Sequence, residues 1–499
     1  MKNSLSLRVL LNPNPKGEAL LKQPRLWHRV RRLNQQPASR KEKVVIEQHQ
    51  SSRIVLVILC FILQLAGAFS HAAQPNIIFI LADDLGYADL GCYGSKVNRT
   101  PHLDRLAAAG IRFTDFHSNG PMCSPTRAAF LTGLYQNRFG RRFEAALSGK
   151  NHDPGLPLEA VTIAEVLRDA GYATGCFGKW HLGYGPPYLP TNQGFDEYRG
   201  LLSGDGDYHT HVDRSGNEDW WHNHVLSGEE GYTTDLVTRH GIDFIRRHHE
   251  KPFFLYLPHL AVHFPWQGPS DPPHRKAGTS YHKDKWGVIP DRANVRPHLT
   301  TMIESLDANV GAIVATLEEL NLTDNTLVFF TSDNGGYLEY RGGFKNISDM
   351  GPLRGQKAEV YEGGHRVPAI AYWPGRIEPS VCDDTTMTFD LFPTFARLAG
   401  SKPGNTGNCD GVDLSGLLFD QKPVGVRTLF WRMGDKKCVR EGRHKLCVLP
   451  NQPPALYDLT TDLGETTNIA ANHPKLVSRL QRALANWEQT VDQSALNWK

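Results

Sequence analysis

Residues 75–94 read PNIIFILADDLGYADLGCYG, an apolar run that stops at two adjacent carboxylates, Asp83 and Asp84. Its apolar part, at 76–81, is typical of a buried strand, and similar runs follow at 172–178, 252–257, 326–332 and 367–373. Helical patterns lie between the runs, at 162–171, 235–250 and 302–321. Strands that alternate with helices predict an α/β fold, with a large mixed, mainly parallel sheet sandwiched by helices. In such sheets the ligand lies beyond the carboxyl ends of the strands.

The pattern of predicted strands and helices changes after about residue 375. Short segments at 427–433, 444–450 and 455–460 are typical of antiparallel strands, and an amphipathic helix is predicted at 474–491. We therefore expect a catalytic α/β domain over 74–375. A smaller C-terminal α+β subdomain of antiparallel strands and a helix would follow over 376–499.

Residues 1–73 have the features of a leader with a signal peptide. The apolar run at 54–69 is short for a membrane span, and small residues follow it, which favours a cleaved signal over a retained anchor. We exclude the leader from the fold and expect a periplasmic or secreted protein, without stable membrane association unless the signal is retained. The formal net charge of +3 is too small to indicate a nucleic-acid partner.

The number of cysteines is odd once the leader is removed. Loss of Cys60 leaves seven of the eight cysteines, so at least one should be free or modified in an oxidising compartment. Cys438 and Cys447 flank a basic turn and could face each other across a hairpin. A pair between Cys382 and Cys409 has less support, because disulfide pairing depends on geometry that the sequence does not supply.

Hard oxygen donors stand at the carboxyl ends of two predicted strands. Asp83 and Asp84 follow the first strand, and Asp333 and Asn334 follow the fourth. Carboxylate and amide oxygens select calcium or magnesium over zinc. Either pair alone could equally be a loop cap, since Asp and Asn favour turns. Two such pairs at two strand ends favour a metal site.

Cations and histidines follow other strand ends. Lys179 and His181 stand two apart, so an extended chain points both to one side. His263 lies just past the third strand, and Arg354 and Lys357 occur in GPLRGQKAEVYEGG. Each could be an ordinary surface charge or a core histidine. Together with a bound cation they would form a pocket for a multiply oxygenated anion, in which the cations stabilise charge and a histidine moves protons.

The stretch PMCSPTRAAF, residues 121–130, places a thiol at the start of a predicted helix. Pro125 suits the first turn, so Cys123 and Ser124 lie at the positive end of that helix, an anion-binding position. Arg127 lies one turn further on and can reach back towards residue 123. A buried structural cysteine beside a helix cap is the alternative.

This stretch resembles the motif C-[SC]-P-x-R of the type I sulfatases of the alkaline phosphatase superfamily, here CSPTR at 123–127. Other segments look like that family's in its order: PNIIFILADDLGYADLGCYG, GKWHLG, HFPWQGP, TSDNGG, PLRGQKAEVYEGGHRVPA and LYDLTTDLGETTNIA. The resemblance covers about 75–499 and points to the arylsulfatase A and N-acetylgalactosamine-6-sulfatase branch. It implies an alkaline phosphatase-like fold and hydrolysis of sulfuric esters.

The resemblance also implies a role for each matching residue. Cys123 would be oxidised after translation to formylglycine, whose hydrate is the nucleophile, by a formylglycine-generating maturation enzyme. Arg127 would stabilise that hydrate. His181 would be the base that breaks down the sulfated hydrate, and His263 would contact the leaving oxygen.

The same resemblance implies ligands for sulfate and for a cation. Two lysines, Lys179 and Lys357, would contact sulfate oxygens. The expected metal is Ca²⁺, with Mg²⁺ or Mn²⁺ as less favoured choices, and its ligands would be Asp83, Asp84, Asp333, Asn334 and the modified side chain at Cys123.

The loop at 203–224, SGDGDYHTHVDRSGNEDWWHNH, is rich in histidine and aromatic residues. Loops on a rigid scaffold carry specificity, so we expect this loop to bind the substrate. Trp220 could stack on a sugar or, equally, anchor the loop to the core. The expected substrate is a sulfated carbohydrate, and the expected contacts are Ser203, which would touch the sulfate, and Asp207, Tyr208, His209, Trp220 and Arg354.

Two other functions remain open at this point. A phosphonate or phosphodiester hydrolase of the same superfamily can share the formylglycine motif. A catalytically inactive carbohydrate-binding homologue would keep the fold but leave Cys123 as a thiol. The presence of every expected catalytic residue argues against the inactive homologue.

Overall fold

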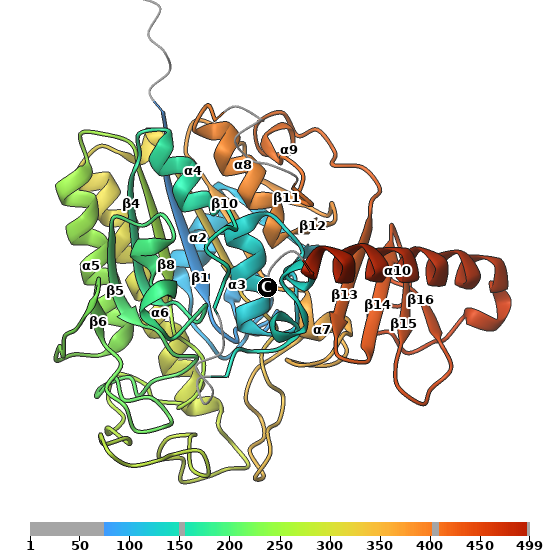
Figure 1. The fold of residues 1–499 in the computed structure, drawn as a ribbon, viewed down its shortest axis with the longest axis horizontal. Coiled ribbons are helices and arrows are strands. Elements are labelled where there is room, and N and C mark those ends of the chain that lie inside the picture. Colours follow the sequence, from blue (N-terminus) through green and yellow to red (C-terminus); the bar gives the residue numbers. More distant parts are fainter. Residues whose placement is uncertain (1–73, 149–154, 402–408, 497–499) are drawn as a thin grey trace, which may run out of the picture. The chain divides into compact units, whose positions relative to one another are not determined.

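The first apolar run forms β1 (Asn76–Ala82), a strand whose seven residues are all buried. The structure is a computed structural model that describes residues 74–148, 155–401 and 409–496, all within the unit His71–Lys499. The predicted leader at 1–73 lies outside these residues. β1 is at the centre of the large sheet (Figure 1), and a hydrophobic core covers each of its two faces, which explains why its sequence is continuously apolar.

Among the described residues the large sheet has ten strands, in the order β11 (Ser380–Cys382), β2 (Ile111–Phe113), β10 (Ala369–Tyr372), β9 (Thr326–Ser332), β1, β8 (Phe253–Pro258), β4 (Ala173–Lys179), β5 (Glu197–Leu201), β6 (Trp221–His222), β7 (Val225–Leu226). The strands from β9 to β5 run parallel to one another. β10 runs antiparallel to β9, and β6 runs antiparallel to β5. The predicted mixed, mainly parallel sheet is confirmed.

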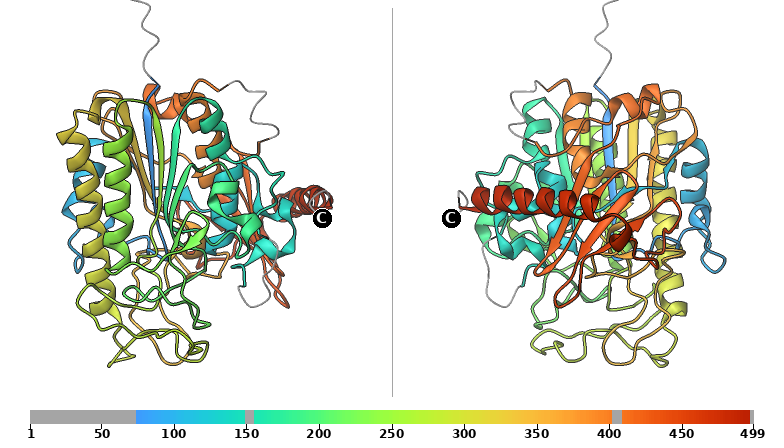
Figure 2. Two further views of the ribbon diagram at one scale, coloured as in Figure 1. Left: turned by 60° about the vertical axis from the view of Figure 1, so that its left-hand side comes forward. Right: turned by 90° about the vertical axis from the view of Figure 1, so that its right-hand side faces the viewer.

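Helices cover both faces of this sheet (Figure 2). One hydrophobic core contains Ile78 and Ile80 of β1 together with side chains of α2 (Pro101–Ala109), α5 (Thr233–His248) and α6 (Arg296–Glu319). The other contains Ile77 and Phe79 together with side chains of α3 (Cys123–Thr132), α4 (Ile163–Asp169), α8 (Leu391–Leu398) and α9 (Ser415–Asp420). Alternate residues of β1 thus point into opposite cores, and each buried side chain of this size contributes about 1.5–3 kcal/mol.

A second, antiparallel sheet is formed by β13 (Thr428–Met433), β14 (Lys436–Glu441), β15 (His444–Val448) and β16 (Ala455–Asp458). Helix α10 (Pro474–Ala495) lies across it (Figure 1) and packs against β14 and β15. The sequence predicts this sheet and its helix, except for β14, whose charged segment KKCVRE lacks an apolar run. Cys438 lies directly opposite Cys447, as expected for a hairpin, and both are thiols in the structure.

Residues after 375 contribute to both sheets. β11 extends the large sheet and α8 packs in its core, whereas the antiparallel sheet begins only at Thr428. Three short elements lie between the two parts: β3 (Phe116–His117), β12 (Thr386–Met387), which pairs with β3, and α7 (Glu362–His365). The division of the chain at residue 375 stays a prediction.

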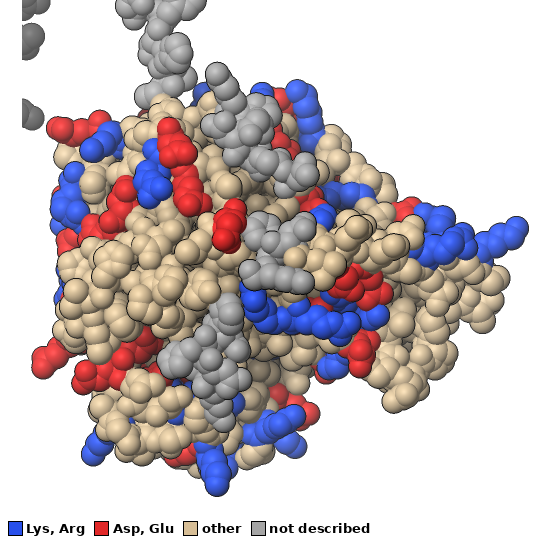
Figure 3. Space-filling view, in the orientation of Figure 1, with Lys and Arg blue, Asp and Glu red and all other residues tan. Residues whose placement is uncertain are grey.

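Charge is distributed without a single dominant sign on the face shown in Figure 3, where basic and acidic side chains are interspersed. No helix in the described parts of the chain combines the length and apolar character that a membrane crossing requires. The predicted catalytic and metal-binding residues gather at the carboxyl edge of the large sheet, at the ends of the parallel strands and in the loops that follow them.

Candidate active site

Two carboxylates are brought together because β1 and β9 pair in register. Ala82 lies opposite Ser332, so the next residues, Asp83 and Asp333, leave the sheet side by side, and the Asp333 amide donates to the Ala82 carbonyl (3.0 Å). Asp84 then turns the chain with a φ of 62°, a left-handed conformation that costs energy in a residue other than glycine. This turn directs its carboxylate to Asn334, whose Nδ2 donates to Asp84 Oδ1 (2.8 Å).

Three oxygens in this cluster are buried without a hydrogen-bond partner: Asp83 Oδ1, Asp84 Oδ2 and Asn334 Oδ1. Burial raises the pKa of Asp84 to about 7, although Lys357 lowers it and Asp83 adds to the increase. Unpaired buried oxygens are costly, and a divalent cation is the partner that would satisfy several at once. The donor set fits a hard, oxygen-ligated cation such as Ca²⁺ or Mg²⁺.

Cys123 is the first residue of α3, a helix whose ten residues are all buried. Its Sγ lies 3.2 Å from His181 Nδ1. Burial raises the pKa of the thiol, and Lys179 and Lys357 oppose this increase. The predicted position at a helix N-terminus is confirmed, and the side chain faces the cluster of carboxylates rather than the hydrophobic core.

Arg127 of helix α3 connects this helix to the ends of strands β1 and β9. Its Nη2 donates to Asp333 (2.8 Å) and to Asp83 (3.1 Å), and its Nη1 donates to the Lys179 carbonyl (2.6 Å). The guanidinium is completely buried, so these pairs are shielded from water and hold the carboxylates in place. Arg127 thus positions the Asp83 and Asp333 carboxylates as well as lying near residue 123.

The two predicted lysines point into the same cluster. The Lys179 ammonium pairs with Asp83 and the Lys357 ammonium pairs with Asp84. Burial alone would lower the pKa of Lys357, but the Asp84 carboxylate outweighs burial and raises it well above the usual value. Lys357 therefore remains charged, and it lines the cavity where an anion could reach it.

The two histidines are neutral and oriented by backbone carbonyls. His181 lies within 3.0 Å of the Leu147 carbonyl through Nε2, so this nitrogen donates and Nδ1 carries the lone pair beside Cys123. In the same way His263 Nδ1 donates to the Phe264 carbonyl (2.6 Å), which leaves Nε2 towards Asp84. Burial, reinforced by Lys179 for His181 and by Lys357 for His263, lowers the pKa of each ring well below the usual range.

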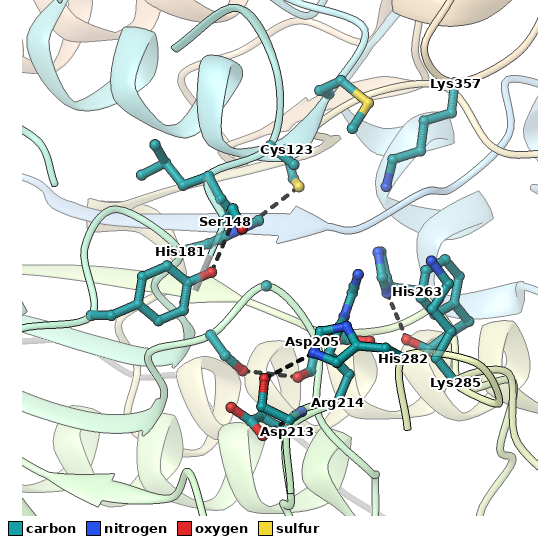
Figure 4. Close-up of a pocket in the computed structure, with 18 of the residues that line it drawn as sticks. Cys123, Ser148, His181, Asp205, Asp213, Arg214, His263, His282, Lys285 and Lys357 are labelled. Carbon is teal, nitrogen blue, oxygen red and sulfur yellow. Dashed lines mark hydrogen bonds and ion pairs between the residues drawn. The ribbon is translucent and has the colours of Figure 1, made fainter. Parts of the chain in front are cut away.

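These groups open onto a cavity of about 400 Å³ (Figure 4). Cys123, His181, Ser203, His263 and Lys357 line it, so the cavity brings together predicted residues from five separate loops or element ends. The carboxylates Asp83, Asp84 and Asp333 lie beneath this surface. The arrangement can bind a tetrahedral oxyanion against two cations while a neutral histidine accepts a proton.

Five other predicted substrate contacts do not line this cavity. Tyr208 is completely buried, and its hydroxyl donates to the Leu260 and His263 carbonyls. Asp207 accepts from four backbone amides, and Trp220 donates to Glu229. For Trp220 this arrangement corresponds to the anchoring alternative. The remaining two also lie elsewhere: His209 lines a separate cavity with Trp220, and Arg354 donates to the Glu465 carbonyl.

Several cavity residues were not among the predicted substrate contacts, although three of them lie in the predicted substrate loop at 203–224. Asp205, Asp213, Arg214, His282, Lys285, Tyr337 and Tyr340 line its outer part. They lie in irregular loops after β5, β8 and β9, where no periodicity predicts which way a side chain points. For Asp205, Asp213 and Arg214 the signal is their place in the predicted substrate loop, and for the others it is a mixture of basic and aromatic residues in loops that follow strand ends.

Comparisons with known proteins agree with this geometry. The family model described as Sulfatase matches residues 75–401. The chain is 34% identical to arylsulfatase A of Homo sapiens, over 84% of this chain and 89% of that protein. It is 35% identical to N-acetylgalactosamine-6-sulfatase of Canis lupus familiaris, over 77% of this chain and 72% of that protein. The solved structure of Ps i-CgsB is similar with a TM-score of 0.73 at 31% identity, over 83% of this chain and 93% of that one, and Ps i-CgsB has also been solved in complex with k-i-k-neocarrahexaose.

Proposed function

The chain belongs to the sulfatase family and is a sulfuric ester hydrolase, and from this premise we propose that it removes sulfate from a sulfated carbohydrate. In the proposal Cys123 is converted to formylglycine. A Ca²⁺ ion is held by the modified side chain together with Asp83, Asp84, Asp333 and Asn334. The protein is exported before it acts.

One observation carries this proposal. Cys123 lies at the inner end of the cavity, and its thiol is only 1% exposed, beside carboxylates that have two unpaired oxygens. An ordinary structural cysteine would pack against apolar side chains. Here the neighbours are Lys179, Lys357 and His181, a setting that suits a nucleophile next to a cation.

Different residues of the chain would then contribute to different parts of sulfate transfer. When present, hydrated formylglycine supplies the nucleophilic hydroxyl and a second hydroxyl for sulfate release, and the cation stabilises negative charge. Lys179 and Lys357 offset the charge that builds on the sulfuryl oxygens. His181 accepts a proton at Nδ1, the nitrogen that the Leu147 carbonyl leaves free.

On the leaving-group side His263 holds its Nε2 towards the site because Nδ1 is engaged by the Phe264 carbonyl. Its position at the cavity surface suits a contact to the departing alcohol oxygen. The cavity wall is rich in polar and charged side chains, which suits a sugar better than an apolar aryl group. The similarity to N-acetylgalactosamine-6-sulfatase and to a protein solved with k-i-k-neocarrahexaose supports the same choice.

The burial of residue 123 also bears on its maturation. A side chain that is 1% exposed cannot enter the active site of another enzyme, so the maturation enzyme must act before the chain has folded. Protein produced without that enzyme would fold and carry a thiol at this position.

The proposal is tested with the exported protein and its Cys123→Ala variant. Peptide mass spectrometry should find formylglycine at position 123 in the active protein, and 4-nitrophenyl sulfate and sulfated oligosaccharides should be hydrolysed. The variant should lose hydrolysis to background while its circular dichroism spectrum and melting temperature stay close to the parent's. Turnover by the variant near the parent's rate, or a clear preference of the parent for phosphodiesters, would overturn the proposal.

A further inference from the structure

Two cations on the outer wall of the active-site cavity have no part in the reaction described above. Lys285 and Arg214 lie across the cavity from Cys123 and Lys357 (Figure 4). They come from different loops, after β8 and β5, and both contact the ring of Phe264. The Lys285 nitrogen is 5.0 Å and the Arg214 guanidinium carbon 5.6 Å from its centroid.

The positive charge of Arg214 is only partly neutralised. Its Nε donates to Asp205 Oδ1 (2.8 Å), but Asp205 also accepts from Arg275 (3.0 Å). Arg275 is completely buried and needs this carboxylate, because an unpaired buried charge is strongly unfavourable. One carboxylate is thus shared by two guanidinium groups, and a net positive charge remains on the side of Arg214 that faces the cavity.

Lys285 makes no ion pair with any carboxylate of the described residues. Its ammonium donates to the Tyr340 hydroxyl (2.9 Å) and lies 5.2 Å from the centroid of the Tyr340 ring. Its carbonyl accepts from Arg275 (2.9 Å), which fixes the backbone of this otherwise irregular segment. The side chain is therefore positioned by neutral and aromatic groups and keeps its charge for a ligand.

Of the acidic groups that line the same wall, Asp205 pairs with Arg214, whereas Asp213 pairs with neither Arg214 nor Lys285. Asp213 also lines the cavity, but its carboxylate accepts from the backbone amides of Ser215 and Asn217 and so caps its own turn. Two cations thus converge beside Phe264, next to His263 on the leaving-group side. A monosulfated substrate would place its only anionic group at the opposite end, near Cys123 and Lys357.

We propose that Lys285 and Arg214 form a second anion subsite, which binds a further sulfate or a carboxylate on the leaving-group part of the substrate. The inference rests on the proposed function and narrows it: the substrate is a carbohydrate with at least two anionic groups, of which one is hydrolysed and another is held beside Phe264. Lys285 determines specificity through binding and does not act on the reacting atoms.

The test compares oligosaccharides of one backbone that carry one or two sulfates per disaccharide, with formylglycine-bearing protein. The parent should have the higher kcat/KM on the disulfated series. Lys285→Met should lower kcat/KM on that series about tenfold more than on the monosulfated series, because the half-buried ion pair between Lys285 and the second sulfate of the substrate is lost. The loss should fall mainly on KM, and raising the ionic strength should affect the variant less than the parent.

Two further variants make the result specific. Lys285→Arg should restore the preference to within about threefold, since it keeps the charge. Lys283→Met, which removes an exposed cation two residues away that does not line the cavity, should leave all parameters unchanged. Equal losses of Lys285→Met on both series, no loss on either, or a parent that prefers monosulfated sugars would overturn the subsite. A parent that hydrolyses 4-nitrophenyl sulfate but no sulfated sugar would instead overturn the carbohydrate proposal on which it rests.

Discussion

Asn334, which follows the end of β9, directs its side-chain oxygen into the cluster of carboxylates. Its Nδ2 donates to Asp84 Oδ1 and to the Gly335 carbonyl, so the side chain is fixed and Oδ1 is turned towards the carboxylates without a partner. A neutral oxygen that is held in this way adds a ligand without adding repulsion among Asp83, Asp84 and Asp333. This combination is what a tight oxygen-ligated cation site needs.

Removal of that oxygen should weaken metal binding more than it weakens the fold. For Asn334→Ala we expect calcium affinity to fall about ten- to a hundredfold, by analogy with the loss of groups that orient metal ligands. Thermal unfolding at increasing Ca²⁺ concentration measures this, because a ligand bound only by the native state raises the melting temperature. A chelator should abolish the stabilisation in the parent protein.

Asn98→Ala is the control, because it removes another buried amide, one that donates to the Asp89 carbonyl outside the cluster. It should lower the starting melting temperature and keep the parent's calcium response. Equal calcium responses of Asn334→Ala and the parent would exclude this residue from the cation site.

Among the elements, β13 and α10 are joined by one buried arginine. Arg432 donates through Nε to Glu144 (2.9 Å) and through Nη2 to Asp492 of α10 (2.6 Å). Its side chain is 2% exposed and that of Glu144 5%, so the buried Glu144 carboxylate depends on Arg432 for a charged partner. One guanidinium group thus contacts the antiparallel sheet, its covering helix and the segment after α3.

We expect Arg432→Met to destabilise the protein by about 3 kcal/mol, because Glu144 would be left buried and unpaired. In the double variant Arg432→Met/Glu144→Gln the loss should be smaller, since the amide carries no charge and can still accept from the Gly434 backbone. Urea denaturation measures both values. Arg479→Met is the matched control: it removes an exposed pair between α10 and Glu441, and its effect should stay below about 1 kcal/mol. Equal effects of the buried and the exposed substitution would contradict this account.

The same elements show how far sequence reasoning reaches. β1, β4, β8 and β9 are predictable because strands covered on both faces require long apolar runs. β14, the three-residue edge strand β11 and its three-residue neighbour β2 are not, since their segments are short or charged and form only against a neighbour already in place. The catalytic cluster could be predicted from residues at strand ends, whereas Lys285 and Arg214 could not, because irregular loops bring them to the cavity.

For the whole molecule, a buried network of charges connects the large sheet with the antiparallel sheet. His117 of β3 and His365 of α7 face each other, with their Nδ1 atoms 3.0 Å apart. Around them lie three carboxylates and three cations, contributed by both parts of the fold: Asp115, Glu362, Glu465, Arg366, Arg440 and Lys445. The histidines and Glu362 could in principle hold a metal ion. The three cations already balance the carboxylates, so a metal ion would add uncompensated charge.

This balance requires the histidines to be neutral. Two Nδ1 atoms at 3.0 Å cannot both carry a proton, and a charged ring would leave the network with excess positive charge. Burial lowers the pKa of His117 and, together with Lys445, lowers that of His365 well below the usual value near 6.5. Because the folded-state pKa is depressed, the unfolded chain binds more protons below about pH 6.5. Stability from the histidines is therefore complete above that pH and is lost as the pH falls towards the folded-state pKa.

The expected result is a steep acid dependence of the free energy of unfolding, with each histidine contributing up to about 1.4 kcal/mol per pH unit. His365→Gln should be less stable than the parent at pH 7.5, since it loses the stacking of the ring on Trp431 (4.2 Å between centroids). Between pH 6.5 and 5, however, its free energy of unfolding should fall less steeply than the parent's, by about 1.4 kcal/mol per pH unit. Urea denaturation across this range gives the slopes. His249→Gln, at an exposed position at the end of α5, should keep the parent's slope. Identical slopes for His365→Gln and the parent would mean that the junction between the two sheets does not set the acid stability of the protein.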